Sequence, residues 1–440
     1  MDSKKPLSIF WFRRDLRLKD NAGLYHALKS GKEVLTLFIF DKNILDKLDD
    51  KSDPRVTFIH QEIQNLNTEL LKYNSSLLIK QGHPLEIWKA LVNEYEIEAV
   101  YTNHDYEPYA RERDSLLKDL FDDKKISFNT FKDHVIFEKD EILKDDEKPY
   151  VVFTPYKNKW LKKLTPFYYQ AYPGEHYFKN LVRKNHQPIP SLEELGFKKT
   201  SVSLPDKAYK NVLQNYSQDR DFPAKDATSK IGLHLRFGTI SIREVVAEAI
   251  KQKSEVWLSE LIWRDFYFSI LWHFPYSAAN SFRKEYDHIR WRNNEQEFKA
   301  WCDGKTGYPL VDAGMRQLNE TGFMHNRIRM VTASFLSKHL LIDWRWGEHY
   351  FASKLLDYEM ASNVGGWQWA AGSGVDAAPY FRIFNPYEQQ KKFDKNLIYI
   401  RKWVPEFDDP FKYPQPIVDH KEARERCLIV YKEALNKNSL

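Results

Sequence analysis

The sequence predicts an α/β domain built on a doubly wound parallel sheet, then a long linker, then an all-α domain. Short apolar runs alternate with segments of helical period from residue 7 to about residue 133. Beyond Leu204, nearly every segment has helical period only. Strands and helices that take turns over short links form parallel sheets covered on both faces. We therefore expect domains at 1–133 and 201–440, with 134–200 as the linker.

The first domain is expected to be Rossmann-like. Its candidate strands are LSIFWF, EVLTLFIF, SLLIKQ, EAVYTN and ISFNTF. Between the second and third, apolar residues recur every three or four positions, the spacing of one buried helix face; these are Val56, Ile59, Ile63, Leu66 and Leu70. No GxGxxG or Walker loop follows the first strand, which argues against an ordinary dinucleotide or ATP site.

Composition excludes several classes of protein. Lys and Arg exceed Asp and Glu by 67 to 62, a weak indication of a polyanionic partner. No signal-peptide pattern opens the chain, so a cytoplasmic protein without a membrane is expected. Cys302 and Cys427 fit neither a metal site nor a disulfide framework. We expect no metal centre.

The helical half is rich in large rings, because ten of the thirteen tryptophans lie between Trp257 and Trp403. Such rings most often form a core. Glu260 and Arg264, four residues apart in the apolar segment SEVWLSELIWRDFYF, do not suit a purely apolar core. They could pair with each other or line a cleft among stacking rings.

Two polar strings allow both a structural and a ligand role. In WFRRDLRLKDN, the charges suit a solvated loop with Asp20 or Asn21 capping the next helix, yet the string follows a strand's carboxyl end, where ligands bind. In DATSKIG, Thr228 or Ser229 could cap a helix or hold a phosphate at a helix start.

Two further strings point to a ligand. In MHNRIRM, Asn326, Arg329 and Met330 share a helical face, while Arg327 points elsewhere. A solvated surface helix would not explain this cluster. In NVGGWQW, Gly365 and Gly366 are expected to break a helix and to let the backbone approach a flat ligand closely.

Taken together, these strings resemble the photolyase and cryptochrome family over almost the whole chain. WFRRDLRLKDN, ELIWRDFY, KTGYPLVDAGMRQL, MHNRIRM and GGWQWAAG…DAAPYFRIFNP match its signatures in order. The resemblance is closest to the class I cyclobutane pyrimidine dimer branch. It implies an N-terminal antenna domain, a linker and a C-terminal helical FAD-binding domain.

The resemblance implies one FAD per chain, active in its reduced anionic form. The implied cofactor-binding residues are Tyr216, Thr228, Ser229, Lys230, Ile231, Gly232, Trp257, Asn326, Arg329, Asp357, Tyr358, Glu359, Asn363 and Gly366. Asn363 would face the flavin N5 edge, where an amide resembles repair enzymes and plant-type cryptochromes carry Asp. Trp367, Trp344 and Trp291 match the tryptophans that pass an electron from the surface to the photoexcited flavin.

On the substrate side, the resemblance implies a lyase that splits pyrimidine dimers in ultraviolet-damaged DNA, acting as a monomer. Rings and polar groups would hold a flipped-out dimer; they are Glu260, Trp263, Asn326, Met330 and Trp369. The residues implied to contact the DNA backbone are Arg220, Arg264, Arg327 and Gln389. The (6-4) branch carries a histidine pair near this pocket, whereas MHNR offers only His325.

Two other functions stay open. One is a cryptochrome-type blue-light photoreceptor without repair activity, although Asn363 and the short segment after Pro405 argue against it. The other is a single-stranded nucleic-acid binder, which would explain the tryptophans but not the cluster of carboxylates, amides and glycines.

Three positions depart from the family pattern. Glu359 stands where many members have Asp, and Phe323 replaces a Trp. Tyr109 and Ala110 stand where folate-antenna members carry Asn and Glu. A folate antenna therefore lacks its carboxylate, and a deazaflavin, a flavin or no second chromophore remains open.

Overall fold

The computed structural model describes residues 6–183 and 188–436, which fold into two compact units. The first unit contains Met1–Glu138, Lys163–Lys207 and Ile231–Lys251. The second contains Lys139–Lys162, Ala208–Lys230 and Gln252–Leu440. The segment 134–200, expected to be a linker, therefore contributes residues to both units.

A five-stranded parallel sheet forms the centre of the first unit and confirms the predicted α/β class. Its strands are β1 (Leu7–Phe12), β2 (Val34–Asp41), β3 (Leu78–Gly82), β4 (Ile97–Asn103) and β5 (Ser127–Phe131). They lie in the order β3-β2-β1-β4-β5, and all neighbours are parallel. Strands β1 and β2 are buried along their whole length, as expected where both faces of a sheet are covered.

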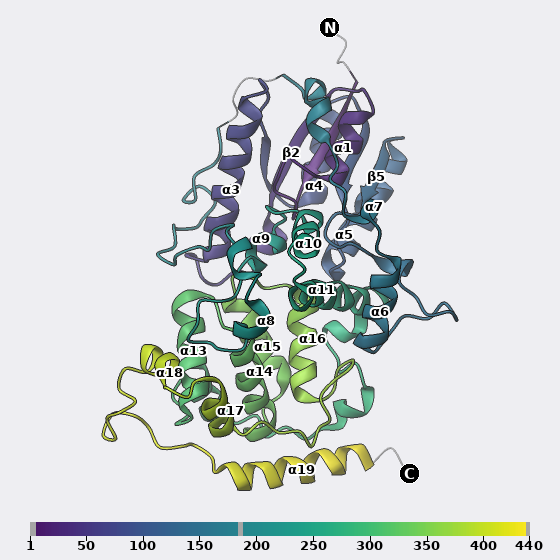
Figure 1. Ribbon diagram of the computed structural model, residues 1–440. Coiled ribbons are helices and arrows are strands. Elements are labelled where there is room, and N and C mark those ends of the chain that lie inside the picture. The colour runs from purple at the N-terminus through teal and green to yellow at the C-terminus, as the bar shows by residue number, and fades with distance from the viewer. Residues whose placement is uncertain (1–5, 184–187, 437–440) are drawn as a thin grey trace. The chain divides into compact units, whose positions relative to one another are not determined.

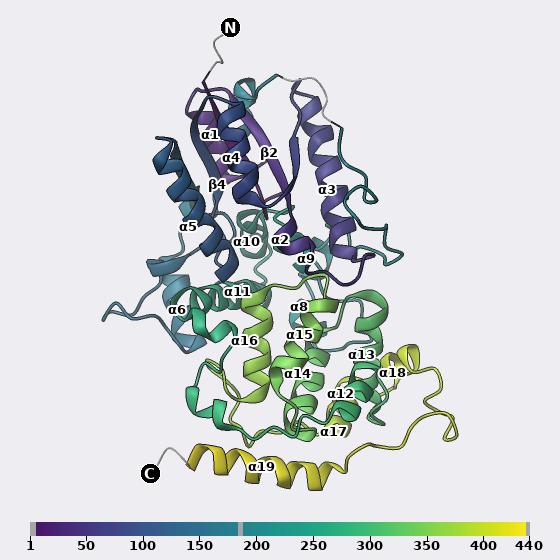
Figure 2. The same ribbon diagram turned by 180° about the vertical axis from the view of Figure 1, so that it is seen from behind.

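Two pairs of helices cover the sheet, and Figures 1 and 2 show it from opposite sides. On one face, α1 (Ala22–Lys29) and α3 (Pro54–Leu71) pack on Phe10 and its neighbours. On the other face, α4 (Pro84–Glu94) and α5 (Pro108–Asp123) pack on Trp11. The unit also contains α2 (Lys42–Leu45), α7 (Pro166–Tyr169), η2 (Gly174–Asn180), α9 (Gly232–Arg236) and α10 (Ile242–Lys251).

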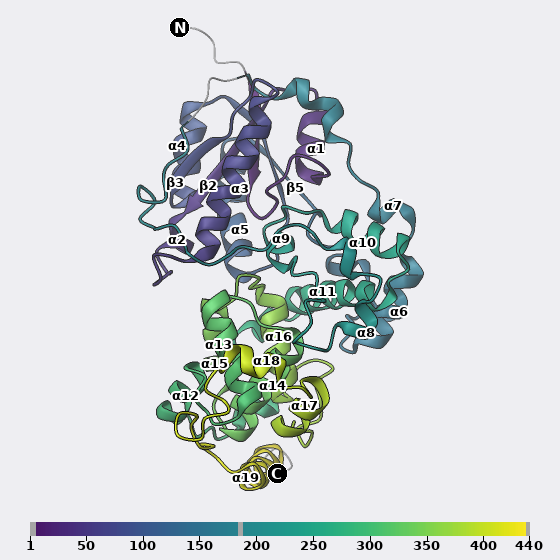
Figure 3. The same ribbon diagram turned by 60° about the vertical axis from the view of Figure 1, so that its left-hand side comes forward.

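Among its described residues, the regular elements of the second unit are all helical, as predicted (Figure 3). They are η1 (Lys139–Glu141), α6 (Phe153–Lys163), η3 (Lys210–Val212), α8 (Tyr216–Asp219), α11 (Glu255–His273), η4 (Pro275–Ala278), η5 (Lys284–His288), α12 (Glu295–Cys302), α13 (Pro309–Thr321), α14 (Asn326–Ser334), η6 (Phe335–His339), α15 (Trp344–Lys354), α16 (Met360–Ala371), α17 (Pro386–Phe393), α18 (Ile398–Trp403) and α19 (His420–Asn436). Helix α16 packs against α11, α14 and α15. In the described residues no helix is long and apolar enough to cross a bilayer, and Cys302 and Cys427 are free and buried.

The glycine pair does not break α16, so that expectation was wrong. Both glycines lie inside the helix, which ends instead at Gly372 in a left-handed conformation. A Cβ on Gly365 would lie 2.3 Å from the Tyr267 ring of α11, so glycine is needed for the two helices to approach. Tertiary packing here outweighs the low helix propensity of glycine.

The arginines of WFRRDLRLKDN are not solvated, which corrects the simplest interpretation of that string. Asn21 caps α1 as expected, accepting a hydrogen bond from the Leu24 N–H. Arg13 pairs with Asp114, Arg14 with Asp105 and Arg17 with Asp133, and all three guanidinium groups are largely buried.

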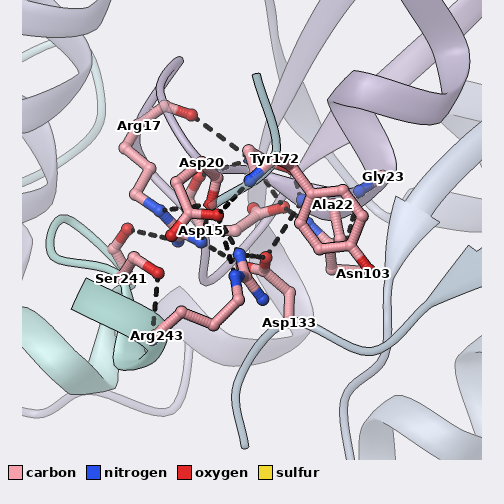
Figure 4. Close-up of polar contacts among 12 residues, drawn as sticks. Asp15, Arg17, Asp20, Ala22, Gly23, Asn103, Asp133, Tyr172, Ser241 and Arg243 are labelled. Carbon is pink, nitrogen blue, oxygen red and sulfur yellow. Dashed lines mark hydrogen bonds and ion pairs between the residues drawn. The ribbon is translucent and has the colours of Figure 1, made fainter. Parts of the chain in front are cut away.

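Arg243 of α10 completes this buried network (Figure 4). Its guanidinium lies 2.8 Å from an Asp20 carboxylate oxygen and 2.7 Å from one of Asp133. Burial alone would raise the pKa of Asp133, but Arg17 and Arg243 hold it well below its usual range. Through these pairs, α10 is tied to the loops at the carboxyl ends of β1 and β5.

We expect Arg243→Met to lower the free energy of unfolding of the protein by about 3–5 kcal/mol, because it leaves buried carboxylates with one partner fewer. The folded-state pKa of Asp133 lies below its unfolded value, so its pairing stabilises the fold above about pH 4, the unfolded pKa, and this contribution is lost as pH falls through the folded pKa. Denaturant unfolding at several pH values measures this. The free energies of unfolding of variant and wild type should differ most at neutral pH, and this difference should become smaller in acid.

Lys32→Met is the matched control. Lys32 pairs with Glu98 at 3.0 Å, but both side chains are about half exposed. Its removal should cost less than about 1 kcal/mol. An equal loss in the two variants would contradict the role given to the buried network.

Candidate functional site

Three helices of the second unit carry most of the residues expected to act. Helix α11 carries Trp257, Glu260, Trp263 and Arg264, and α14 carries Asn326, Arg327, Arg329 and Met330. Helix α16 carries Asn363, Gly366, Trp367 and Trp369. Because α16 packs against both α11 and α14, segments that are distant in the sequence meet on one central helix.

Arg329 and Asp357 form one polar pair of the expected cofactor set. The Arg329 guanidinium donates to both Asp357 carboxylate oxygens at 2.9 and 3.0 Å, and to the Met324 carbonyl at 2.8 Å. The two side chains are 26% and 21% exposed. A guanidinium and a carboxylate held rigidly side by side offer both donors and acceptors to a polar heterocycle.

Asn363 is held by a residue that the sequence did not indicate. Its amide donates to the Glu348 carboxylate at 2.9 Å and to the Glu348 backbone carbonyl at 3.2 Å. Burial raises the pKa of Glu348. Since the amide nitrogen faces Glu348, the amide oxygen of Asn363 is directed elsewhere, with its orientation fixed. Glu348 lies on α15, in a string without any recognisable pattern.

Thr228 and Ser229 do not cap a helix, which removes their structural explanation. Helix α9 begins at Gly232, and its N-cap residue is Ile231, without a side-chain cap. Thr228 and Lys230 instead line a cavity of about 170 Å³ together with Phe323 and His325. Lys230 also pairs with Asp226 at 2.5 Å. Ile231 and Gly232 begin the part of the chain that belongs to the first unit.

The remaining residues of the expected cofactor set are buried or partly buried in the second unit. Trp257 stacks on Tyr209, with ring centroids 5.4 Å apart. Glu359 is buried and precedes α16, and Tyr358 packs against the helical core. Tyr216 is buried on α8, and burial together with the nearby Glu260 raises its pKa to about 12.

On the expected substrate side, Glu260 pairs with Arg220 rather than with Arg264. The Arg220 guanidinium donates to the Glu260 carboxylate and lies 5.3 Å from the Tyr216 ring centroid. Arg264 instead lies over the Phe268 ring, at 4.7 Å. Two residues expected in different roles, one at the dimer and one at the DNA backbone, are thus joined in one ion pair.

The other expected substrate residues lie on α11, α14, α16 and α17. Arg327 pairs with Asp221 at 2.9 Å and covers the Phe393 ring at 4.3 Å, so it does point away from Arg329, as predicted. Trp263 stacks on Phe153, and the ring centroids of Trp369 and Phe384 are 6.4 Å apart. Gln389 lies on α17, and Met330 lies on α14.

The three tryptophans expected in the relay belong to one apolar core. Trp344 and Trp367 are buried in it, and Trp291 packs against it while partly exposed. A Cβ on Gly347 of α15 would lie 2.0 Å from the Trp367 ring, so α15, which begins at Trp344, packs tightly on that ring. Two of the three rings are therefore buried, and one is partly exposed.

Comparison with known proteins supplies the family. Two family models match the chain. The model described as "DNA photolyase" matches residues 8–175, and the model described as "FAD binding domain of DNA photolyase" matches residues 257–433. The Escherichia coli protein named deoxyribodipyrimidine photo-lyase is 38% identical, over 97% of this chain and 98% of its own. The chain belongs to the DNA photolyase family.

Solved structures of this family share the fold. An archaeal photolyase from Sulfolobus tokodaii, described with two FAD molecules, is 34% identical with a TM-score of 0.82, covering 98% of this chain and all of the other. A Synechocystis cryptochrome is 25% identical with a TM-score of 0.86, again over 98% of this chain and all of the other. Photolyases and cryptochromes are thus both structural neighbours.

The residues of the FAD-binding domain fit such a cofactor. A Cβ on Gly366 would meet nothing within 4 Å, although Gly366 lies inside a packed helix next to Asn363. The backbone of α16 is therefore open on the side of Gly366. The Arg329–Asp357 pair, the fixed Asn363 amide and the hydroxyl and ammonium groups of Thr228 and Lys230 supply the polar groups.

We expect Gly366→Ala to stabilise the cofactor-free protein by about 1 kcal/mol, since alanine is the better helix former and its Cβ meets no neighbour. The same methyl group should lower the FAD content of the purified protein, because it fills the space left for the ring. Thermal unfolding and the flavin-to-protein absorbance ratio measure the two effects.

Gly365→Ala provides the comparison, because its Cβ would collide with Tyr267 at 2.3 Å. It should destabilise the cofactor-free protein by about 1–3 kcal/mol. Full FAD content in Gly366→Ala would show that this face of α16 does not meet the cofactor.

Proposed function

We propose that the protein repairs cyclobutane pyrimidine dimers in ultraviolet-damaged DNA in a light-dependent reaction, as a deoxyribodipyrimidine photo-lyase. One observation carries the proposal: α11, α14 and α16 each carry residues that we propose for the cofactor and residues that we propose for the lesion. A dimer bound by these helices would therefore lie next to the flavin ring. Short range is what electron transfer between the two requires.

The lesion residues hold and orient the dimer. Glu260 is already paired with Arg220, so a dimer that donates a hydrogen bond to Glu260 meets a group fixed in advance. Asn326, at the first position of α14, adds an amide. Trp263, Trp369 and Met330 supply apolar surface that replaces the base stacking lost on flipping. The proposed contacts of the DNA backbone are Arg220, Arg264, Arg327 and Gln389.

The cofactor residues bind FAD, with one FAD per chain. FAD supplies light-driven one-electron chemistry, active here from the reduced anionic form. Thr228, Ser229 and Lys230 bind the diphosphate, while Arg329 and Asp357 bind the polar edge of the flavin ring. Glu348 holds the amide of Asn363, so the amide oxygen is oriented to form a hydrogen bond with the edge of the flavin ring. Trp257 and Gly366 shape the walls of the pocket.

Trp367, Trp344 and Trp291 serve activation rather than repair. Their common core excludes water from Trp367 and Trp344, and Trp291 reaches the surface. The indole N–H groups of Trp344 and Trp367 are buried without an acceptor in the described structure. An oxidised indole at either position therefore has no protein group to take its proton, which favours passing the electron hole outward to Trp291.

A cryptochrome-type photoreceptor is the second candidate, because a cryptochrome is among the structural neighbours. The amide of Asn363 and the paired Glu260 and Arg220 favour repair, since a receptor has no need for a dimer site.

We also propose that the protein does not use a folate antenna. The Tyr109 hydroxyl donates to Asp41 at 2.5 Å and accepts from Asn43 at 3.1 Å, and Ala110 is buried. No carboxylate stands at the two positions where folate binders carry Asn and Glu. A deazaflavin or a second flavin fits better, and the Sulfolobus tokodaii photolyase holds a second FAD.

The purified, photoreduced protein should convert a thymine-dimer oligonucleotide to undamaged thymines under blue light, with no conversion in the dark. Glu260→Ala should bind the dimer about tenfold more weakly or worse, because it removes a charged hydrogen-bonding group. Chromatography of the oligonucleotide and dark binding titrations measure the two effects. Illuminated wild type that leaves the dimer intact would falsify the repair proposal and favour the photoreceptor.

Trp291→Phe should block photoreduction of the oxidised protein but preserve repair by chemically reduced protein. Phenylalanine keeps the packing against the core but gives up an electron far less readily than tryptophan. Flavin absorbance under illumination measures the first effect, and the oligonucleotide assay the second. Trp272→Phe is the control, since Trp272 has no role in the relay. Loss of repair in the chemically reduced variant would contradict the separation of activation from repair.

A further inference from the structure

The ring of Trp263, proposed to contact the dimer, is covered on one face by the protein itself. Phe153 lies parallel to it, with ring centroids 3.6 Å apart and planes 7° apart. Aromatic pairs usually stand offset or edge to face, 4.5–7 Å apart. Phe153 is only 7% exposed. This full stack leaves no room for a base on that face of Trp263.

Phe153 is held firmly because α6 is docked on α11. The Phe153 N–H donates to the Asp376 carboxylate at 3.1 Å, which fixes the start of α6. Lys157 donates to the Ser259 hydroxyl at 3.3 Å, and Trp160 donates to Asp265 at 3.0 Å. Residues 153, 157 and 160 lie on one face of α6, and on this face the Phe153 ring, Lys157 and Trp160 contact α11.

A second ring flanks Trp263 from within α11. Tyr267, one turn later, lies 5.5 Å from Trp263 with planes 30° apart, and it rests on the backbone of Gly365. Phe153, Trp263, Tyr267 and Gly365 thus form a continuous stack. It runs from α6 across α11 to α16, one residue from Gly366 and two from Asn363.

We propose that Phe153 is a positioning residue for dimer binding: it covers one face of Trp263 and locks the indole in the orientation in which the lesion meets it. This inference rests on the proposed function. It adds a residue from outside the sequence motifs to the lesion site. Locking the ring before the DNA arrives lowers the ordering cost of binding.

The test compares dark binding of the holoprotein to a duplex with one thymine dimer and to the undamaged duplex. Phe153→Leu keeps the apolar contact but removes the ring. We expect about 3- to 10-fold weaker binding of the dimer duplex, the value of one aromatic pair, and unchanged binding of the undamaged duplex. Phe153→Tyr keeps the stack and should restore the affinity. Repair yield at saturating DNA should be unchanged in both.

Two controls separate positioning from general loosening of α6. Trp160→Phe removes the hydrogen bond to Asp265 but leaves the stack, so the affinity for the dimer should stay near that of wild type. In a Trp263→Ala background, Phe153→Leu should have no further effect, because its role acts through Trp263. The proposal is overturned if Trp160→Phe loses as much affinity for the dimer duplex as Phe153→Leu does. It is also overturned if the losses of affinity of Phe153→Leu and Trp263→Ala add in the double variant.

The outcomes for wild type distinguish the two proposals. If wild type prefers the dimer duplex and Phe153→Leu matches it, the positioning role is wrong and the repair proposal stands. If wild type shows no preference for the dimer duplex, both are wrong.

Discussion

The close packing of α16 is the constraint on which the second unit depends. This helix is in contact with α11, α14 and α15, and two glycines make the approach possible. Gly365 accepts the ring of Tyr267 from α11, and Gly347 on α15 accepts the ring of Trp367. In both places a methyl group would overlap a ring carbon. Because α16 also carries Asn363, Trp367 and Trp369, its packing fixes residues proposed for the flavin, the relay and the lesion at once.

Buried charge organises the first unit in a different way. The arginines of its opening string are used inside the unit, in ion pairs with Asp105, Asp114 and Asp133. Arg243, more than 200 residues later in the chain, adds to the same network. Breaking such a pair leaves an uncompensated buried charge, whereas an exposed pair contributes little. The network therefore holds the loops at the carboxyl edge of the sheet in one arrangement.

The polar groups of the proposed lesion site are paired before any DNA is bound. Arg220 with Glu260 and Arg327 with Asp221 each place an acid against a base. A polyanionic ligand would have to compete with these acids for the guanidinium groups, which costs part of the Coulombic gain. In exchange, the paired side chains already have fixed positions when DNA binds. Trp263 follows the same principle with apolar contacts, since Phe153 and Tyr267 flank it.

The sequence alone determined the features that local pattern controls. Strands β1 to β5, the amphipathic α3, the Asn21 cap and the helical character of the second unit all follow from hydrophobic period and capping within a few residues. Resemblance of short strings added the candidate residues, and their roles at the site remain predictions. The tertiary structure decided the rest: that Gly365 and Gly366 continue a helix, that Glu348 orients Asn363, that Arg243 joins the network around Asp133, and that Phe153 covers Trp263. Each of these depends on a contact between residues distant in sequence, or on the space that a neighbouring helix leaves. Local periodicity carries no information about either.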